Sequence, residues 1–482
     1  MATRSTSFLV AFALMVSALF ASPPSLDLPA WVGSVGAKST PPAGPVLSAN
    51  AFGAVADGTT LATAAIQRAI DTCALRGGGT VTLAPGRYLT GALFVKSGVR
   101  LRIDAGVTLV ATTDEKAYPL LPTRIGGIEM VWPAALINVY GQHNAEIDGE
   151  GAIDGQGPYW WKKFWDLRAA YIPRGLRWAA DYDCRRLRLI TVWKSQNVTV
   201  SRLHLHRSGF WTVQITYSDH VTVDGITIAD NFMSEGIKGA STDGVDVDSS
   251  RYVLVQHCDI DNNDDDICLK AGRDADGLRV NRPTEYVVIR DNVCRRGGGV
   301  VSFGSETAGV IRHVVAYRDV GIGTSEGLRF KSTPTRGGGV EDVLIRDVTL
   351  TNVPRPFTFT LDWNPAYSDV KIPDGMKNIP AMWRAVAAPV QPPERGYPFM
   401  RDITIANVRV TGARQIMTVS GLPQKPLGAV RWENITAQGT EAGSIRYAHD
   451  WTMSGVQFRT SDGKPVKSGH CDRVELPVVS HE

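Results

Sequence analysis

Six short stretches decide the fold: Asn197-Val-Thr-Val200, His220-Val-Thr-Val223, Tyr252-Val-Leu-Val255, Tyr286-Val-Val-Ile289, His313-Val-Val-Ala316 and Asp342-Val-Leu-Ile345. Their leading valines are 23, 32, 34, 27 and 29 residues apart, and Asp402-Ile-Thr-Ile405 continues the series after a long insertion. One coil of this size cannot bury its apolar face alone, whereas stacked coils share a continuous core. We therefore predict an all-β chain folded as a parallel β-helix, a solenoid of short strands.

The runner-up folds are a β-sandwich and a β-propeller. A propeller needs blades with internal hairpins, and the repeat region lacks hairpin dipeptides such as Asn-Gly. The uneven spacing of the repeats indicates turns of different length that project from the stack. Such turns are where a binding cleft is expected.

The N-terminal part divides into three segments. Residues 1–22 combine a basic residue, a short apolar run and small residues, which predicts a secretory signal peptide and a secreted or periplasmic protein. An uncleaved membrane anchor is the alternative. Residues 23–48 are rich in Pro, Ser, Gly and Ala and are expected to form a linker or loosely attached arm, followed by a β-helix catalytic domain over 49–475. Apolar residues at helical spacing near Thr60–Leu75 predict a helix that caps the first coil.

Composition excludes some partners. The net charge is only +3, which does not favour a nucleic-acid binder. The six cysteines form no C-x-x-C pattern and no dense disulfide framework. We expect a monomer without cofactor or metal that contacts no nucleic acid and, after signal cleavage, no membrane.

Two acidic phrases hold the densest chemistry. They are Ser241-Thr-Asp243-Gly-Val-Asp-Val-Asp248 and Asn262-Asn-Asp264-Asp265-Asp266-Ile-Cys-Leu-Lys270. Asp264 follows Asp243 by 21 residues, close to one coil, so the phrases should lie on neighbouring coils about 4.8 Å apart. Crowded carboxylates force one member to keep its proton, which is what glycoside hydrolysis requires. A solvated Asp-rich turn and a calcium site remain alternatives.

A basic pair follows downstream. Arg329 and Lys331 are two residues apart, so on a strand they project from the same face. Together they would suit a substrate carboxylate, although a solvated basic face is the simpler reading.

The chain resembles glycoside hydrolase family 28, the polygalacturonases and their relatives, from about Phe52 to about Val343. The resemblance rests on the two acidic phrases and on Phe52-Gly-Ala-Val-Ala-Asp-Gly, Ile153-Asp-Gly-Gln-Gly-Pro-Tyr-Trp-Trp, Ser208-Gly-Phe-Trp211 and Arg329-Phe-Lys331. It implies a right-handed parallel β-helix and metal-free, inverting hydrolysis of galacturonosyl bonds in pectic polysaccharide or its oligomers. It further implies Asp264 as general acid, Asp243 and Asp265 as the residues that hold and activate water, and Arg329 and Lys331 as contacts to a substrate carboxylate.

One position departs from the family. Gly298, in Arg296-Gly-Gly298-Gly, stands where the family has a histidine thought to help set the protonation of the aspartates. Two rival functions therefore stay open: a polysaccharide lyase on the same fold, with the aspartates holding Ca²⁺, and a non-catalytic carbohydrate-binding protein.

Overall fold

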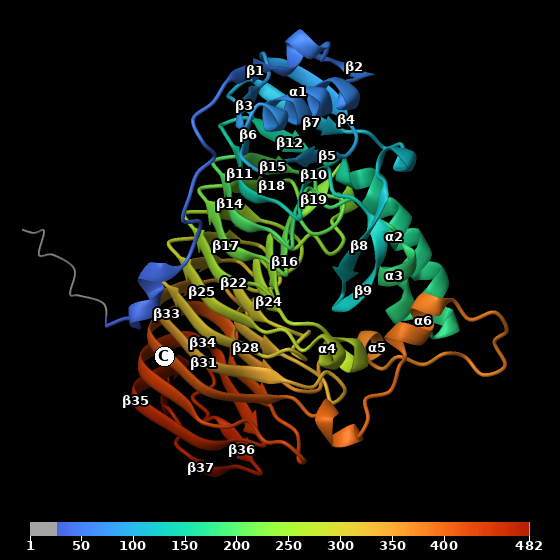
Figure 1. The fold of residues 1–482 in the computed structure, drawn as a ribbon. Helices are drawn as coiled ribbons and strands as arrows, with labels where there is room; N and C mark the ends of the chain where they lie inside the picture. The colour runs from blue at the N-terminus through green and yellow to red at the C-terminus, as the bar shows by residue number, and fades with distance from the viewer. Residues whose placement is uncertain (1–26, 482) are drawn as a thin grey trace, which may run out of the picture.

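The computed structural model describes residues 27–481, in which parallel strands stack into one long solenoid (Figure 1). The fold is a right-handed parallel β-helix, as predicted. The expected signal peptide, residues 1–22, lies outside the described residues. No helix in the described part of the chain is long and apolar enough to cross a membrane.

Each coil contributes a strand to each of three parallel stacks. The first stack contains β5 (Leu93–Val95), β10 (Ile137–Tyr140), β13 (Ile190–Trp193), β16 (Val213–Thr216), β21 (Val245–Asp248), β24 (Ile267–Lys270), β27 (Val301–Phe303), β30 (Glu326–Lys331), β32 (Arg355–Thr360) and β36 (Lys467–Gly469). The second contains β1 (Val46–Ser48), β3 (Gly79–Thr82), β6 (Val99–Arg102), β11 (His143–Asp148), β14 (Gln196–Ser201), β17 (Asp219–Asp224), β22 (Arg251–Gln256), β25 (Thr284–Arg290), β28 (Ile311–Tyr317) and β37 (Asp472–Val474).

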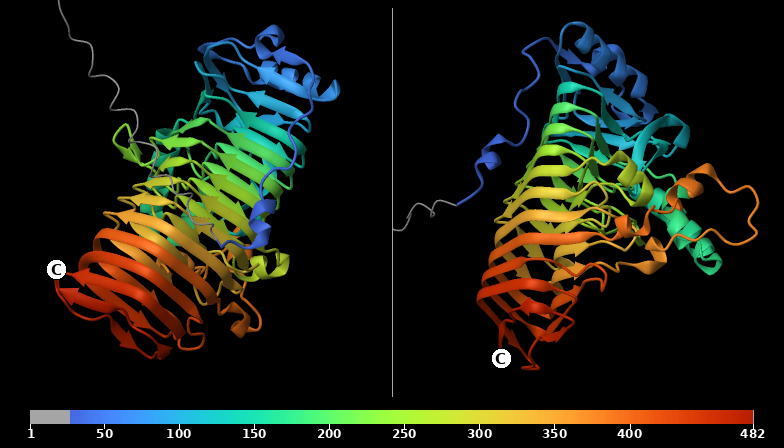
Figure 2. Two further views of the ribbon diagram at one scale, coloured as in Figure 1. Left: turned by 90° about the vertical axis from the view of Figure 1, so that its left-hand side faces the viewer. Right: turned by 60° about the horizontal axis from the view of Figure 1, so that its bottom comes forward.

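The third stack contains β2 (Asp57–Leu61), β4 (Gly86–Thr90), β7 (Val107–Ala111), β12 (Ala152–Asp154), β15 (His204–His206), β18 (Thr227–Ala229), β23 (Asp259–Asp261), β26 (Val293–Arg295), β29 (Val320–Ile322) and β38 (Val478–His481). Towards the C-terminus, long strands bend through more than one stack: β31 (Gly339–Thr351), β33 (Phe399–Ser420), β34 (Val430–Arg446) and β35 (His449–Thr460). Figure 2 shows this regular stacking along the whole solenoid.

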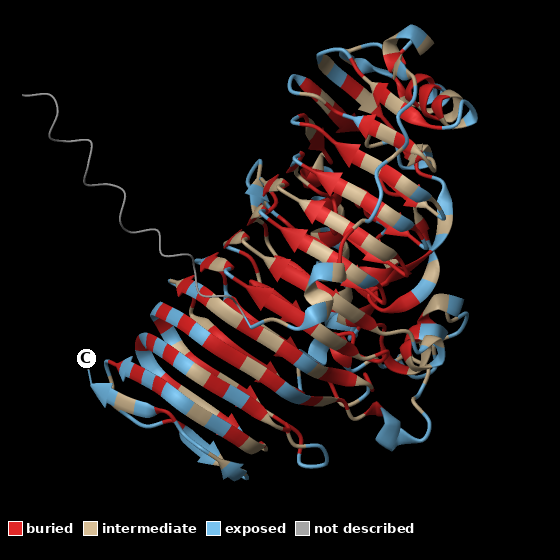
Figure 3. Cartoon of the chain, turned by 60° about the vertical axis from the view of Figure 1, so that its left-hand side comes forward, coloured by how far each residue is buried: buried red, intermediate tan, exposed pale blue. Residues whose placement is uncertain are grey.

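The repeated phrases form the second stack in strict register. Val198, Val221, Val253, Val287, Val314 and Val343 pair one after another, and Ile403 pairs with Val343 as the seventh member. All seven side chains point into the core, with at most 2% of their surface exposed. Alternate residues therefore build one apolar column, visible as the buried bands in Figure 3.

Helix α1 (Thr63–Leu75) caps the N-terminal end of the solenoid, as predicted. Its apolar stripe, which includes Ile66 and Ile70, is fully buried, and the helix contacts β3, β5 and β6. The cap covers the apolar interior that the first coil would otherwise leave exposed.

Residues 28–39, expected to be a linker or arm, lie against the second stack. Trp31, within the 3₁₀ helix η1 (Ala30–Ser34), packs edge-on against Tyr286 of β25, with ring centres 5.5 Å apart. The arm then donates hydrogen bonds to four successive coils, at Tyr252 O, Thr222 Oγ1, Asn197 Oδ1 and Asn144 Oδ1.

Three insertions gather on one side of the first stack (Figures 1 and 2). They contain the antiparallel hairpin β8 (Leu120–Ile125) and β9 (Ile128–Pro133), the helices α2 (Gly157–Tyr171), η4 (Ile172–Arg174), η5 (Arg177–Ala179) and α3 (Ala180–Asp183), and the helices α5 (Pro365–Ser368), α6 (Ala381–Val386) and η6 (Pro393–Gly396). They share a satellite core in which Trp178 meets Trp383 at 5.1 Å and Ile128 is buried. The smaller elements are η2 (Ala49–Phe52), η3 (Glu115–Ala117), α4 (Asp274–Val280), and the strands β19 (Met233–Ser234) and β20 (Ile237–Lys238).

Candidate active site

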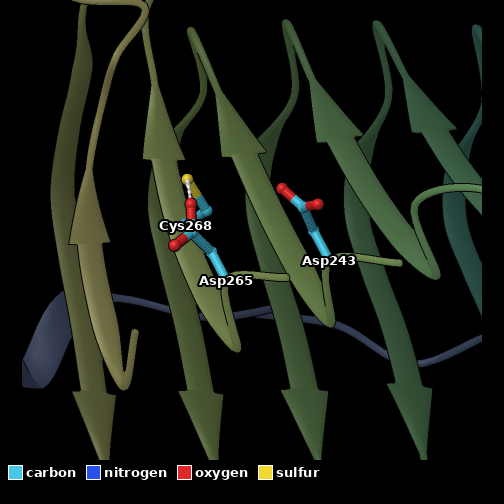
Figure 4. A group of neighbouring side chains, drawn as sticks. All are labelled: Asp243, Asp265 and Cys268. Atoms are coloured by element: carbon cyan, nitrogen blue, oxygen red, sulfur yellow. Dashed lines mark hydrogen bonds between the residues drawn. The ribbon is translucent and has the colours of Figure 1, made fainter. Parts of the chain in front are cut away.

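The two acidic phrases lie on neighbouring coils, as the sequence predicts. Strand β21 pairs with β24 so that Val245 faces Ile267, which places Asp243 beside Asp265 at the entrance to the two strands. The Gly244 N–H donates to the Asp265 carbonyl at 3.0 Å and fixes this alignment. Carboxylate oxygens of Asp243 and Asp265 and the sulfur of Cys268 all lie within 4.8 Å of one another (Figure 4).

Asp264 completes a cluster of three carboxyls at one pocket. The pocket has a volume of about 140 Å³, and Asp243, Asp264 and Asp265 all line it. Asp264 is half-buried and accepts a hydrogen bond from the Asp265 N–H at 3.0 Å, whereas Asp243 and Asp265 are buried. The pocket is further lined by Ile125, Gly126, Arg177, Asp181, Phe210, Trp211, Ser241, Lys270, Ser305, Glu306, Lys331, Trp363, Asn364 and Tyr367.

Asp265 is held as an anion by two cations from β30. Lys331 Nζ lies 2.6 Å from Asp265 Oδ2, and Arg329 Nη1 lies 2.8 Å from Oδ1. The Ser302 hydroxyl also donates to Oδ1, at 2.7 Å. Burial alone would raise the pKa of Asp265, but the charges of Lys331 and Arg329 hold that pKa far below its usual range. Lys331 lines the pocket directly, while Arg329 contacts Asp265 without being one of the residues that line the pocket.

Asp243 has the opposite electrostatic environment. Burial raises the pKa of Asp243 to about 7; Lys270 opposes the rise, and the charges of Asp264 and Asp265 add to it. Lys270 Nζ lies 3.1 Å from Asp243 and 3.2 Å from the fully buried Asp246. The environment of Asp243 therefore favours the protonated form, mainly through burial rather than crowding, and Asp265 is its ionised neighbour. Burial also raises the pKa values of Asp246 and Asp266 well above the usual range.

Arg329 occupies the space beside Gly298. A β-carbon placed on Gly298 would lie 3.2 Å from Arg329 Nη1 and 3.1 Å from the backbone of Asp264 and Asp265. A side chain at this position would therefore press against a guanidinium that contacts the same carboxyl cluster.

The residues at this cluster do not fit a metal ion. Asp243, Asp265 and Cys268 are close enough to share one, but Lys270, Lys331 and Arg329 already neutralise the carboxylates. Burial raises the pKa of the Cys268 thiol well above its usual value, and a thiol must lose its proton to ligate a metal. This charge pattern argues against the calcium-dependent lyase alternative.

An aromatic wall faces the carboxyls. Trp363 is half-buried, and Lys331 Nζ lies 4.7 Å from the centre of its ring. Tyr367 is buried, and its ring also lines the pocket. Aromatic surfaces of this kind suit the apolar face of a sugar.

Sequence reasoning did not assign a role to Arg177, Lys270 or Glu306, which also line the pocket. Lys270 carries a usable signal, because it ends strand β24, which begins directly after Asp266. Arg177 comes from an insertion that has no local motif, so only the packing of the insertions brings it to the site.

Buried carboxyls whose pKa values are driven apart, beside an aromatic-lined pocket, define a glycoside hydrolase built on a parallel β-helix. The sequence profile described as "Glycosyl hydrolases family 28" matches residues 82–415, and the chain belongs to this family.

The chain is similar both to relatives named as endo-acting enzymes and to relatives named as exo-acting enzymes. An endo-polygalacturonase of Pectobacterium carotovorum subsp. carotovorum is 31% identical over 66% of this chain and 78% of its own length. An exo-poly-alpha-D-galacturonosidase of Dickeya chrysanthemi is 26% identical over 87% and 75%. The crystal structure of an exopolygalacturonase from Thermotoga maritima covers 85% of this chain and 90% of its own, with a TM-score of 0.68 and 24% identity, which shows a shared fold.

Proposed function

We propose that this enzyme hydrolyses galacturonosyl linkages in pectic polysaccharide or its oligomers with inversion of configuration. The observation that carries the proposal is the pocket where Asp243, Asp264 and Asp265 meet beside cations and aromatic rings. The names of the related polygalacturonases support the choice of substrate. Cationic groups at the carboxyls suit a negatively charged sugar.

In this proposal Asp264 protonates the leaving oxygen, while Asp243 and Asp265 hold the attacking water. Asp264 is the least enclosed of the three and can reach a bound glycan at the pocket surface. Asp243 and Asp265 approach within 4.8 Å of each other, close enough for one water to contact both. The pKa of Asp243 near 7 supports a second assignment, in which Asp243 supplies the proton and Asp265 acts as base.

A leaving-group experiment separates the two assignments. Asp264→Asn and Asp243→Asn would be compared on galacturonate oligomers and on an aryl galacturonide whose leaving group needs no proton. The variant that lacks the acid should lose several orders of magnitude on oligomers and recover most activity on the aryl substrate. Recovery by Asp243→Asn alone would transfer the acid role to Asp243, and undiminished oligomer cleavage by both variants would refute the site.

Product analysis tests the reaction class. Purified protein would be incubated with polygalacturonate and with rhamnogalacturonan, and NMR would follow the anomer first formed. We expect an inverted reducing end, no unsaturated uronide, and no loss of rate with a chelator. Chelator-sensitive release of unsaturated products would establish the lyase, and binding without turnover would establish the non-catalytic alternative.

We further propose cleavage near a chain end, because the cleft is closed towards the N-terminal coils. Hairpin β8–β9 covers the first stack on the N-terminal side of the site: Gln214 is buried, and its Nε2 donates to the Arg124 carbonyl at 3.0 Å. Beyond the site the outward row is also buried at Ser302 and Thr358 and becomes half-exposed at Thr418 and Ser444. In this proposal the hairpin blocks one end of the cleft, so a bound polymer extends towards the later coils.

The size of the first products tests this closure. A chain-end enzyme should release short products from polygalacturonate from the start, while the viscosity of the solution falls slowly. An early fall in viscosity with a ladder of long oligomers would show internal cleavage instead.

Export is proposed from the N-terminal sequence alone. The signal-like residues 1–22 would be removed during secretion to the medium or periplasm. N-terminal sequencing of the exported protein should begin near residue 23, and retention of an intact N-terminus in the membrane fraction would contradict the proposal.

A further inference from the structure

Arg177 is a pocket cation with unused hydrogen-bonding capacity among the described residues. It belongs to η5, and its Nη1 forms an ion pair with Asp181. Its other guanidinium N–H groups have no partner among residues 27–481. Its side chain keeps 18% of its surface exposed, and its guanidinium carbon lies 5.5 Å from the centre of the Tyr367 ring.

The remaining cations of the pocket are already neutralised. Lys270 is shared by Asp243 and Asp246, and Lys331 is bound to Asp265. Both lysines stabilise protein carboxylates, so a substrate carboxylate would have to compete with those contacts.

The surroundings of Arg177 leave a positive charge uncompensated. Asp181 is its only ion-pair partner in the described chain, and Asp181 also binds the fully buried Arg186 at 3.2 Å. Two guanidinium groups thus share one carboxylate. Arg177 and Asp181 line the pocket together with Gly126 of the hairpin.

We propose that Arg177 binds the carboxylate of a galacturonate unit in this pocket and makes the enzyme specific for the free acid over its methyl ester. The inference rests on the proposed function. The planar guanidinium can keep its bond to Asp181 on one side and present free N–H groups to a carboxylate on another. Its place on the insertions that close the cleft indicates that it recognises the unit nearest the closed side.

The test compares Arg177→Gln and Arg177→Lys with the wild type on galacturonate oligomers and on their methyl esters. Arg177→Gln should raise KM for the free acid at least tenfold, change kcat by only a few-fold, and abolish the preference for the acid over the ester. Arg177→Lys keeps the charge but loses the planar fork, so its KM should fall between the two. Arg174→Gln, an exposed arginine of the same insertion, is the matched control and should leave both constants unchanged.

Separate results would overturn the inference and the proposed function. If the wild type cleaves free-acid oligomers and both Arg177 variants keep its KM and its acid preference, the inference fails alone. Equal losses on acid and ester, accompanied by a lower Tm, would assign Arg177 a purely structural role through Asp181. If the wild type cleaves no galacturonate substrate, the proposed function fails and the inference fails with it. Should Arg177→Gln not fold, Arg177→Lys alone decides, because it keeps a cation beside Asp181.

Discussion

At the scale of single residues, the ionisation of Asp265 depends on two cations of the protein itself. Asp265 is buried, yet Arg329 and Lys331 keep its pKa far below the usual range. Glu326, in turn, lies 2.9 Å from Arg329 Nε and holds the guanidinium in place. Removing one cation should therefore be visible as a change in pH dependence rather than only as a loss of rate.

Arg329→Gln should raise the pKa of Asp265 towards the ordinary aspartate range, because one of its two ion-pair partners is lost. Activity that needs ionised Asp265 should then decline at a higher pH on the acid side, with kcat/KM reduced at least tenfold. The measurement is the pH profile of kcat/KM. Arg318→Gln, which removes an exposed ion pair with Asp291 elsewhere on the solenoid, should leave the profile unchanged.

Gly298→Ala tests whether the lack of a side chain at position 298 is essential to the placement of Arg329. The new β-carbon would lie 3.2 Å from Arg329 Nη1 and 3.1 Å from the backbone of the Asp264–Asp265 pair, so the guanidinium must shift. We expect kcat to fall by about tenfold or more, with the acid limb moving in the same direction as in Arg329→Gln. Gly33→Ala, where the β-carbon meets nothing within 4 Å and the backbone is not left-handed, is a steric control. An unchanged profile in Gly298→Ala would show that Arg329 tolerates displacement.

The sequence predicted the pairing of the carboxyl phrases but not the charges that tune them. The 21-residue spacing of Asp243 and Asp264 predicted neighbouring coils, and the observed register of β21 on β24 then places Asp243 beside Asp265. The glycine at position 298, where the family has a histidine, could not be interpreted from the sequence. Its neighbour Arg329 lies 31 residues later in the chain, on another coil. The raised pKa of Asp243 is likewise set by burial, with Lys270 opposing the rise, and no local sequence pattern reveals either effect.

At the scale of elements, repeats were predictable and insertions were not. The valine-led phrases became paired strands because one apolar residue per coil must meet its equivalent in the next. The residue before each valine adopts a left-handed backbone, for example His220 with φ 55° and Tyr252 with φ 54°. The insertions instead depend on contacts such as Trp178 with Trp383, more than two hundred residues apart, which periodicity cannot indicate.

The N-terminal arm gives a prediction at this scale. Trp31→Ala removes the edge contact with Tyr286 and the packing of the arm on Val288 and Val315. We expect a loss of about 1–3 kcal/mol in local stability, seen as faster hydrogen exchange and proteolysis over residues 27–39. Catalysis should be unaffected, because the arm packs on the second stack. Protection equal to the wild type would show that the backbone bonds of the arm suffice without the ring.

At the scale of the whole molecule, stability should depend on pH through carboxyls buried in the solenoid. Asp319 is the clearest case, since it lies outside the pocket and is 1% exposed. Its Oδ1 accepts hydrogen bonds from the backbone N–H and the side-chain amide of Asn292, while Oδ2 has no partner. Burial raises its pKa to about 7; the Asn292 bonds and Arg318 oppose the rise, and Asp291 adds to it.

The sign of the effect follows from proton linkage. The native state binds the Asp319 proton more tightly than the unfolded chain, whose aspartate has the ordinary value of 3.8. The stabilisation of the native state by the Asp319 proton is complete below about pH 4 and is lost as the pH rises through about 7. A shift of about three units corresponds to about 4 kcal/mol as an upper bound.

Asp319→Asn isolates this one group from the other titrations. The asparagine can keep an oxygen towards Asn292 and carries no charge, so the variant should unfold at a higher Tm than the wild type at pH 8 and at a similar Tm at pH 4.

Asp291→Asn should change the stability in the opposite direction. Arg318 lowers the pKa of Asp291, so its contribution exists above the ordinary aspartate pKa and its loss should destabilise the protein at pH 8. Thermal unfolding of the three proteins at both pH values checks the pair. Equal shifts in the two variants would mean that Asp319 is not the buried acid responsible.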